Sequence, residues 1–498
     1  MIKYKRLIMN SEHRTITRRG FVGGALALVG ISSLATAGVT QSGNVRGANE
    51  AIGLAIVGLR KKGKEHIKGF RAIPGVQIVA LCDCDTAFLD LEAQRFKERN
   101  ESIQRYTDYR KLLENKDIDA VVIVTPDHWH ALMTVWACQA GKDVYVEKPA
   151  TYSIWEGRRM IEAARKYKRI VQVGSQNRSD VGLRAAIPYI QEGNLGKIRM
   201  VRGFHFGRRA SIGKVSGPQP IPATCDYDLF QGPAPLVPLM REQLHYDWHW
   251  FWETGTGEMG NIGAHQLDHA RWAMGQQAAA PRAVSFGGRF GYDDDGETPN
   301  TQVVYFDYKP VPLIYEIRAL TRRTGDPALD TYRGLRASLR VECEGGFFAG
   351  GRGGGWAYDN EGRRIRQFKG DGGRDHQANF IKAVRSRKVS DLRADILQGH
   401  TSSTLCHMAN ISYRLGHRMP PQSVKKAVST NDVLGESVDR IFSHLRANEI
   451  DLEVNPIRMG PMLDFDLEQE QFTGEQNEWA NMFLKRIYRP PFIVPEIV

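Results

Sequence analysis

Residues 51–178 alternate short apolar runs with helical segments, a pattern that leaves few folds open. β-prone apolar runs occur at 52–57, 76–81, 120–124, 143–146 and 170–173, and helical patterns follow at 130–140 and 154–167. Buried strands that alternate with helices are typical of a parallel sheet covered by helices on each face. The pattern therefore predicts an α/β domain of the doubly wound, dinucleotide-binding type.

The first strand of this pattern is followed by Gly58 and Gly63, with Arg60 between them, in the arrangement G-x-R-x-x-G. In the dinucleotide-binding fingerprint the middle position is glycine, which lets the backbone approach the pyrophosphate. The second strand ends at Asp83, 25 residues after Gly58, near the place where an acid accepts hydrogen bonds from the adenine ribose. Asp83 favours NAD over NADP, whereas Arg60 and the two lysines after it could meet an extra phosphate.

A lysine follows the run 143–146. Pro149 cannot donate to a sheet ladder, so the strand ends there and Lys148 lies at its C-terminal edge. In an open parallel sheet that edge faces the ligand crevice, where an ammonium could reach a substrate oxygen. The alternative is a solvated lysine that only closes a strand. One strand earlier, Asp127 is placed to cap the helix 130–140 and to direct its partly positive N-terminus into the crevice.

His245, Asp247 and His249 alternate with three aromatic residues. In an extended chain these three polar side chains would share one face, and the aromatic side chains the other. Aromatic faces beside polar groups suit a sugar, and ordinary core or interface packing is the alternative. A His-x-Asp-x-His pattern without a fourth partner is a loose zinc signal, so no metal site is predicted.

The segment 255–268 reads GTGEMGNIGAHQLD. On a continuous helix Asn261 and His265 are one turn apart and share a face with Asp268. An unperturbed histidine titrates near neutral pH, so His265 is the candidate general base of this segment. The alternative is a histidine that packs in the core.

Three linked motifs resemble the Gfo/Idh/MocA family of NAD(P)-dependent sugar and polyol oxidoreductases. They are the TPxxxH run that ends at His130, the tripeptide Glu147-Lys148-Pro149 and the run VGSQNR at 173–178. The resemblance implies that Lys148 contacts the substrate hydroxyl. It also implies cofactor contacts from Thr125, Pro126, His130 and Glu147, and substrate contacts from Gln176 and Arg178.

The segment 255–268 resembles the family run GGGxxxDxGxHxxD, in which an Asp and the His flank the reacting carbon. Asn261 replaces that Asp and cannot ionise, so it can position a hydroxyl but leaves proton transfer to His265. We therefore expect Asn261→Asp to be tolerated.

The second half of the family is a large, mostly antiparallel sheet with helices on one face. The runs 199–206, 301–308, 312–320 and 338–344 read as its strands. Family members pair through the open sheet face, which implies a dimer or tetramer.

The N-terminus resembles a twin-arginine export signal. Arg18 and Arg19 precede an uncharged run and the small-residue pattern at 35–37, where cleavage is expected. The run is shorter than the roughly 20 apolar residues that span a membrane, so no stable anchor is expected. Because this route carries folded proteins, it suits an exported or periplasmic protein whose cofactor is already bound.

The length of 498 residues and a hydrophobic fraction of 42% suffice for two cores and additional segments. The net charge is +12, but basic and acidic residues are interspersed, which argues against a nucleic-acid partner. The six cysteines lack paired CxxC spacing, and most of them read as buried thiols. The glycine-rich stretch 345–355 reads as turns, and 375–387 and 391–415 as helices.

The predicted division is a signal peptide at 1–37, a flexible arm at 38–50, an NAD-binding domain at 51–175, a substrate and sheet domain at 176–423, and a packing extension at 424–498.

Together these features predict an oxidoreductase with a Rossmann-type α/β domain and an α+β domain built on a large, mostly antiparallel sheet. The predicted reaction is hydride transfer from a secondary alcohol of a sugar, polyol or glycoside to tightly bound NAD. One alternative is a redox-neutral enzyme in which transient oxidation allows a glycosidic bond to be eliminated. Another is a non-catalytic sugar- or cofactor-binding protein.

Overall fold

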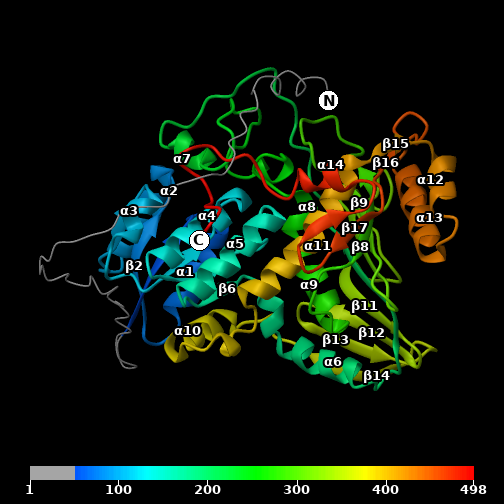
Figure 1. Cartoon of the computed structure of the whole chain (residues 1–498), viewed down its shortest axis with the longest axis horizontal. Helices are drawn as coiled ribbons and strands as arrows, with labels where there is room; N and C mark the ends of the chain where they lie inside the picture. The colour runs from blue at the N-terminus through cyan, green and yellow to red at the C-terminus, as the bar shows by residue number, and fades with distance from the viewer. Residues whose placement is uncertain (1–50) are drawn as a thin grey trace, which may run out of the picture. The chain divides into compact units, whose positions relative to one another are not determined.

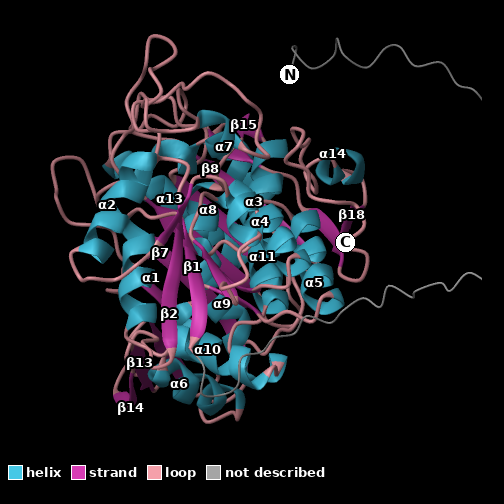
Figure 2. Cartoon of the chain, turned by 90° about the vertical axis from the view of Figure 1, so that its left-hand side faces the viewer, coloured by secondary structure: helices cyan, strands magenta, loops and turns pink. Residues whose placement is uncertain are grey.

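The computed structural model describes residues 51–498, so the predicted export signal and arm lie outside the described residues. The first domain is a six-stranded parallel sheet in the order β3-β2-β1-β4-β5-β6, which confirms the predicted doubly wound arrangement (Figures 1 and 2). Its strands are β1 Ile52–Val57, β2 Val76–Cys82, β3 Gln104–Tyr106, β4 Ala120–Ile123, β5 Asp143–Val146 and β6 Val171–Val173. Its helices are α1 Lys61–Arg71, α2 Thr86–Lys97, α3 Tyr109–Leu113, α4 His130–Gln139 and α5 Ile154–Lys166.

All six residues of β1 are buried, because alternate side chains enter separate cores on the two faces of the sheet. Ala55 and Val57 pack with α4 and α5, whereas Leu54 and Ile56 pack with α1. This two-sided burial is what an uninterrupted apolar run predicts.

The second domain is built on a twelve-stranded, mostly antiparallel sheet, as predicted. Its main path runs β14-β13-β12-β11-β7-β10-β9-β8-β16-β15, and β7 and β10 are parallel. The strands are β7 Ile198–Phe206, β8 Arg282–Gly288, β9 Thr301–Phe306, β10 Leu313–Arg318, β11 Ala337–Cys343, β12 Gly346–Gly351, β13 Gly354–Tyr358, β14 Arg364–Lys369, β15 His417–Met419, β16 Ile457–Met459, β17 Leu463–Asp466 and β18 Gln471–Thr473. The helices are α6 Val181–Gln191, α7 Tyr227–Gln231, α8 Gly257–Asn261, α9 Gly263–Ala273, α10 His376–Ser386, α11 Ile396–Leu415, α12 Pro421–Ala427, α13 Asp432–Ala447 and α14 Asn477–Asn481.

The glycine-rich stretch 345–355 was predicted as turns, and that prediction is wrong for most of it. It forms β12 and the start of β13, which pair antiparallel. A Cβ on Gly350 or Gly355 would lie 2.5 Å from the facing backbone carbonyl of Gly354 or Ala349, respectively, and almost as close to the ring of Phe348. The glycines therefore allow two strands to approach closely beneath an aromatic ring.

Helices cover both faces of part of the large sheet, which differs from the one-sided cover implied by the resemblance. Helices α9 and α11 pack on one face. On the other face, α12 and α13 pack against alternate residues of β8, β9 and β10, and Figure 1 shows them at the end of the sheet beside β15 and β16. Buried Arg202 of β7 also bonds to Ser437 of α13.

Two later segments return to the first domain. Phe380 and Val384 of α10 join the core beneath β1, and the C-terminal residues Phe492, Val494 and Val498 join the core beside α4. The predicted packing extension thus contributes both to the large sheet and to the first domain.

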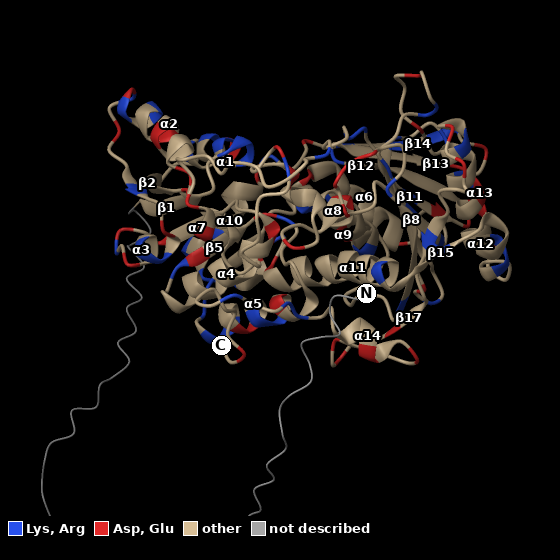
Figure 3. Ribbon diagram, turned by 90° about the horizontal axis from the view of Figure 1, so that it is seen from above, with Lys and Arg blue, Asp and Glu red and all other residues tan. Residues whose placement is uncertain are grey.

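Basic and acidic residues are intermixed along the ribbon (Figure 3). Over residues 51–498 no helix is both long and apolar enough to cross a bilayer. All six cysteines are free thiols, and five of them are buried, as predicted.

Candidate active site

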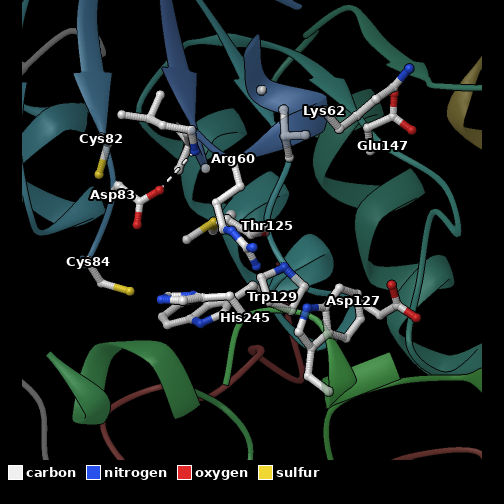
Figure 4. Close-up of a pocket in the computed structure, with 18 of the residues that line it drawn as sticks. Arg60, Lys62, Cys82, Asp83, Cys84, Thr125, Asp127, Trp129, Glu147 and His245 are labelled. Carbon is white, nitrogen blue, oxygen red and sulfur yellow. Dashed lines mark hydrogen bonds between the residues drawn. The ribbon is translucent and has the colours of Figure 1, made fainter. Parts of the chain in front are cut away.

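A cavity of about 530 Å³ lies at the C-terminal ends of β1, β2, β4 and β5, the edge predicted for the ligand crevice. Its walls come from both domains and from the C-terminal segment (Figure 4). Gly58, Arg60, Gly63 and Asp83 line one end, and Lys148, Asn261 and His265 line the other.

The loop after β1 requires glycine. Gly58 has a φ of +87°, and a Cβ there would lie 2.6 Å from the carbonyl oxygen of Val124. A Cβ on Gly63 would collide with the carbonyl of Gly58, so close contact between loop and helix explains the second glycine. The guanidinium of Arg60 lies 5.2 Å from the centre of the Phe88 ring. Burial lowers the pKa of Arg60, and Asp83 is close enough for its carboxylate to act in the opposite direction.

Asp83 lies where β2 ends, as predicted. Its carboxylate accepts hydrogen bonds from the backbone N–H of Leu59 at 2.8 Å and of Asp85 at 3.0 Å. Burial raises the pKa of Asp83 to about 6, against the effect of these two donors. The loop glycines, the start of α1 and this carboxylate together match the chemistry of an adenine ribose and pyrophosphate.

Two predictions about the segment after β4 need correction. Thr125 and Pro126 line the cavity, but His130 does not. The ring of His130 is buried and pairs with the carbonyl oxygens of Pro149 at 2.7 Å and Thr125 at 2.9 Å, so it holds two cavity loops together. Asp127 does not cap α4; it accepts from the hydroxyl of Thr256 at 2.6 Å and thereby joins the two domains.

Lys148 is held in place from both domains. Its Nζ donates to the backbone carbonyl of Asn261 at 2.7 Å and to the Asn261 side-chain oxygen at 3.0 Å. Glu147, beside it, pairs with His66 at 2.8 Å and accepts from Gln176 at 2.9 Å. Burial lowers the pKa of Lys148, while the neighbouring carboxylates, that of Glu147 first, act in the opposite direction.

The predicted continuous helix through 255–268 is broken between α8 and α9 at Ile262. His265 still reaches the cavity, and its Nδ1 has no hydrogen-bond partner among the described residues. Burial and then the charge of Lys148 lower the pKa of His265 to about 3, instead of leaving it near neutral pH. His265 is therefore a neutral acceptor at physiological pH.

A carboxylate that sequence analysis missed supports Asn261. Glu258 is buried, accepts from the Asn261 side-chain amide at 3.1 Å, and forms a 2.6 Å ion pair with Arg209. These contacts form a chain of polar side chains that runs from Arg209 through Glu258 and Asn261 to Lys148. Glu258 lies three residues before Asn261 on a short helix, and that spacing is the signal that could have found it.

Arg178 and Asp268 form a buried ion pair at 2.8 Å that does not line the cavity. The predicted substrate contact of Arg178 is therefore replaced by a role in packing. Gln176 does line the cavity, where it also donates to Tyr145.

The segment 245–250 is not extended as predicted, because Asp247–Trp250 forms a 3₁₀ turn. His249 lines the cavity with its ring stacked on Trp248 at 3.6 Å, while Asp247 is buried elsewhere. His245 lies at the nucleotide end, not beside Lys148, and its Nε2 is 2.7 Å from Asp85.

Two further cavity residues were not anticipated. Phe492, from the C-terminal segment, packs at 5.3 Å from Trp129, which also lines the cavity. Arg352 arrives from the turn between β12 and β13. Neither position has a local sequence signal, because only the tertiary fold brings these segments to the site.

Comparisons with known proteins agree with this architecture. Residues 52–175 match the profile described as oxidoreductase family, NAD-binding Rossmann fold, and residues 196–308 match oxidoreductase family, C-terminal alpha/beta domain. Inositol 2-dehydrogenase of Salmonella typhimurium is 32% identical over 180 residues, which are 35% of this chain and 51% of that protein. Alpha-N-acetylgalactosaminidase of Shewanella oneidensis is 30% identical over 125 residues, 24% of this chain and 27% of that protein. The chain thus spans about half, or less, of the length of these relatives.

Among solved structures, the WlbA dehydrogenase of Bordetella pertussis, in complex with NADH and UDP-GlcNAcA, has a TM-score of 0.55 at 20% identity. The match covers 73% of this chain and 97% of that one. At this identity the likeness establishes the fold alone.

Proposed function

We propose that this chain, which contains the NAD-binding and C-terminal domains of the Gfo/Idh/MocA oxidoreductases, is an NAD-dependent dehydrogenase acting on a secondary alcohol of a sugar, polyol or glycoside. The observation that carries the proposal is one cavity that joins the nucleotide-type end at Asp83 to Lys148 and His265 at the other end. A bound dinucleotide would lie along Gly58, Gly63 and Asp83. When bound, its nicotinamide supplies the acceptor for the hydride.

The chain's own residues supply proton transfer and charge stabilisation. His265 is neutral and lines the cavity, so its imidazole ring can accept the proton of the substrate hydroxyl. Lys148 lines the cavity and donates two of its three ammonium N–H groups to Asn261, which leaves the third for a substrate. That donor would stabilise the developing negative charge on the substrate oxygen.

Asn261 and Glu258 position Lys148 and do not transfer the proton. Asn261 offers an oxygen to Lys148 and an amide to Glu258, so the negative charge lies one residue further from the cavity than an Asp at 261 would place it. Glu258 in this way supplies a carboxylate beside Asn261, the position at which the family run has an Asp.

We infer that the cofactor is NAD and that it is tightly bound. The Asp83 carboxylate would accept from the ribose hydroxyls and repel a 2′-phosphate, a like-charge contact that costs several kcal/mol when desolvated. The proposed twin-arginine export of a folded protein to the periplasm would favour a cofactor that does not dissociate. The proposed substrate is a small carbohydrate or polyol.

The redox-neutral, glycoside-cleaving alternative is favoured by one observation, the similarity to the Shewanella galactosaminidase. In that reaction a ring carbon would be oxidised only transiently. A binding protein without turnover is the third possibility, suggested by Arg60 and Asn261 in place of the family residues.

The test is to denature purified mature protein, identify the released nucleotide, and assay the intact protein with sugars, polyols and aryl glycosides. We expect about one NAD per chain and stoichiometric formation of reduced nicotinamide with an alcohol substrate. Bond cleavage without net reduction would select the alternative, and ligand binding without turnover the third reading. Absence of nucleotide together with weak NAD binding would overturn all cofactor-based proposals.

A further inference from the structure

A cluster of metal-ligating side chains lies beside the nucleotide end of the cavity, outside the proposed catalytic groups. A carboxylate oxygen of Asp85, the sulfur of Cys225 and a ring nitrogen of His245 lie within 4.8 Å of one another. They come from three separate segments: the residue before α2, the residues before α7, and the loop before the 3₁₀ turn 247–250. In the described part of the chain, no other group of three such side chains is placed this closely.

A second thiol, that of Cys84, lies next to the cluster. The thiol of Cys84 is hydrogen-bonded to that of Cys225, and Figure 4 shows the Cys84 side chain pointing toward the ring of His245. Asp85 and Cys225 face each other in an isolated antiparallel bridge, and the N–H of Asp226 donates to the carbonyl of Cys84 at 2.9 Å. The backbones that carry these ligands are therefore already joined.

The donor set suits zinc. Two sulfurs, one imidazole nitrogen and one carboxylate oxygen complete a tetrahedral site with bonds of about 2.3 Å to sulfur and about 2.0–2.2 Å to nitrogen and oxygen. Neighbouring ligands of such a site are about 3–4 Å apart. Asp85, Cys225 and His245 already lie within 4.8 Å of one another, whereas Cys84 lies outside this group and has to turn toward the ion. Asp85 and Cys225 are 2% and 8% exposed, whereas Cys84 and His245 are partly exposed and line the cavity, so the ion would lie in the cavity wall.

The surroundings set the electrostatic balance. The rings of Phe88 and Phe230 pack edge-on against His245 at 5.0 and 5.7 Å, which limits access of water. Arg60 and Arg241 are close enough to act on His245 and oppose a cation. Two thiolates and a carboxylate bring three negative charges into contact with the ion, which outweighs two cations outside the ligand shell.

We propose that Cys84, Asp85, Cys225 and His245 bind one Zn²⁺, which fastens the loop over the cavity to the ribose-binding edge of the first domain. The link is direct, because the backbone N–H of Asp85 donates to the Asp83 carboxylate at 3.0 Å. Binding displaces the two thiol protons and the proton shared by His245 and Asp85; nothing is oxidised or reduced. The ion makes no contact with the catalytic groups and acts by holding the cavity wall.

The test measures zinc in the purified, metal-reconstituted full chain, with Cys225→Ser and His245→Gln as variants and Cys343→Ser as the matched control. Cys343 is also a buried thiol but lies in β11, away from the cluster. We expect about one zinc per chain in wild type and in Cys343→Ser, and at least a tenfold lower occupancy in the other two. Cobalt in place of zinc should give thiolate-to-metal absorption that Cys225→Ser abolishes.

If the variants fail to fold, wild type alone decides, because a thiol-blocking mercurial should release the zinc to a colorimetric chelator in step with modification of Cys84 and Cys225. Wild type that takes up no zinc, or that contains a Cys84–Cys225 disulfide by peptide mass spectrometry, overturns the proposal. Either result is independent of whether NAD is bound.

Discussion

Asp83 is a partly exposed carboxyl at the proposed nucleotide end of the cavity, where its protonation state would bear directly on cofactor binding. Burial raises its pKa to about 6, so at pH 7 it is mainly ionised and can accept from ribose hydroxyls, whereas below pH 6 the free protein must lose a proton to do so. Binding therefore weakens as the pH falls.

We predict that the Kd for NAD rises by up to about tenfold per pH unit below pH 6, the limit for one linked proton. Asp83→Asn should bind NAD more weakly and lose this dependence between pH 4.5 and 6.5. Asp247→Asn is the control, because the pKa of Asp247 is also raised to about 6 by burial but its side chain does not line the cavity. A pH-independent wild type, measured by calorimetry, would contradict the role given to Asp83.

The effect expected for the substitution Asn261→Asp changes once the structure is known. The sequence predicts that Asn261→Asp is tolerated because it restores a family residue. In the structure the amide of Asn261 donates to Glu258 at 3.1 Å, so an Asp there would bring two carboxylates together and remove a donor.

We therefore predict that Asn261→Asp lowers kcat, and that adding Glu258→Gln restores most of the loss because glutamine can donate to the new carboxylate. The coupling between the two changes should lie in the range of about 0.5–3 kcal/mol seen for contacting residues. The measurement is a double-mutant cycle on kcat. Additive effects would mean that Glu258 does not position Asn261.

At the scale of elements, the strands and helices that follow a regular period were predictable. The runs of the parallel sheet and the four strands of the second sheet appear within one to a few residues of their expected bounds, because burial on known faces fixes their pattern. The strands β12 and β13 were missed because their glycines serve close packing instead of turns.

The candidate site divides in the same way. Gly58, Asp83 and Lys148 were predictable because each lies where a strand ends and the fold dictates what that edge faces. His130, Arg178 and His245 lie close to the predicted places but bond to protein partners, since buried polar groups take whichever partner the tertiary fold provides. Nothing local in the sequence marks Phe492 as a cavity residue.

The C-terminal segment is an element whose contribution can be measured. Phe492 is 1% exposed and packs on Trp129 at the cavity wall. We predict that Phe492→Ala lowers the free energy of unfolding by about 3–5 kcal/mol and weakens NAD binding. Ile487→Ala, in the same segment but 88% exposed, should change neither. Denaturant unfolding with and without NAD tests this, and equal behaviour of the two variants would show that the segment only covers the surface.

At the scale of the whole molecule, the large sheet offers less open surface than the resemblance implies. Helices α12 and α13 cover the face over β8–β10. On the same face of β12 and β13, Phe347 and Tyr358 remain partly exposed and stack on each other at 4.7 Å. If the predicted homo-oligomer forms through the open face, it must use this part.

We predict that Tyr358→Glu reduces the molar mass measured by light scattering toward that of a monomer, because a charge would be buried in the contact. NAD binding should be unchanged, since Tyr358 does not line the cavity. Ser443→Glu, on the outer surface of α13, is the control. A wild-type monomer, or an oligomer that Tyr358→Glu leaves intact, would refute this contact.

We have proposed that Lys148 and His265 act on a substrate alcohol beside NAD. The most direct test is the single-turnover rate of nicotinamide reduction in nucleotide-loaded wild type, Lys148→Met, His265→Ala and Lys142→Met. Lys142, the residue before β5, is the matched control. It is a buried lysine that donates to the backbone carbonyls of Asn115 and Ile118 and does not line the cavity. We expect the single-turnover rate to fall by about 10²- to 10⁴-fold in Lys148→Met and in His265→Ala with NAD still bound. In Lys142→Met we expect a change in protein stability at most and the wild-type rate. A folded, NAD-loaded His265→Ala that reduces its cofactor at the wild-type rate would contradict the proposal.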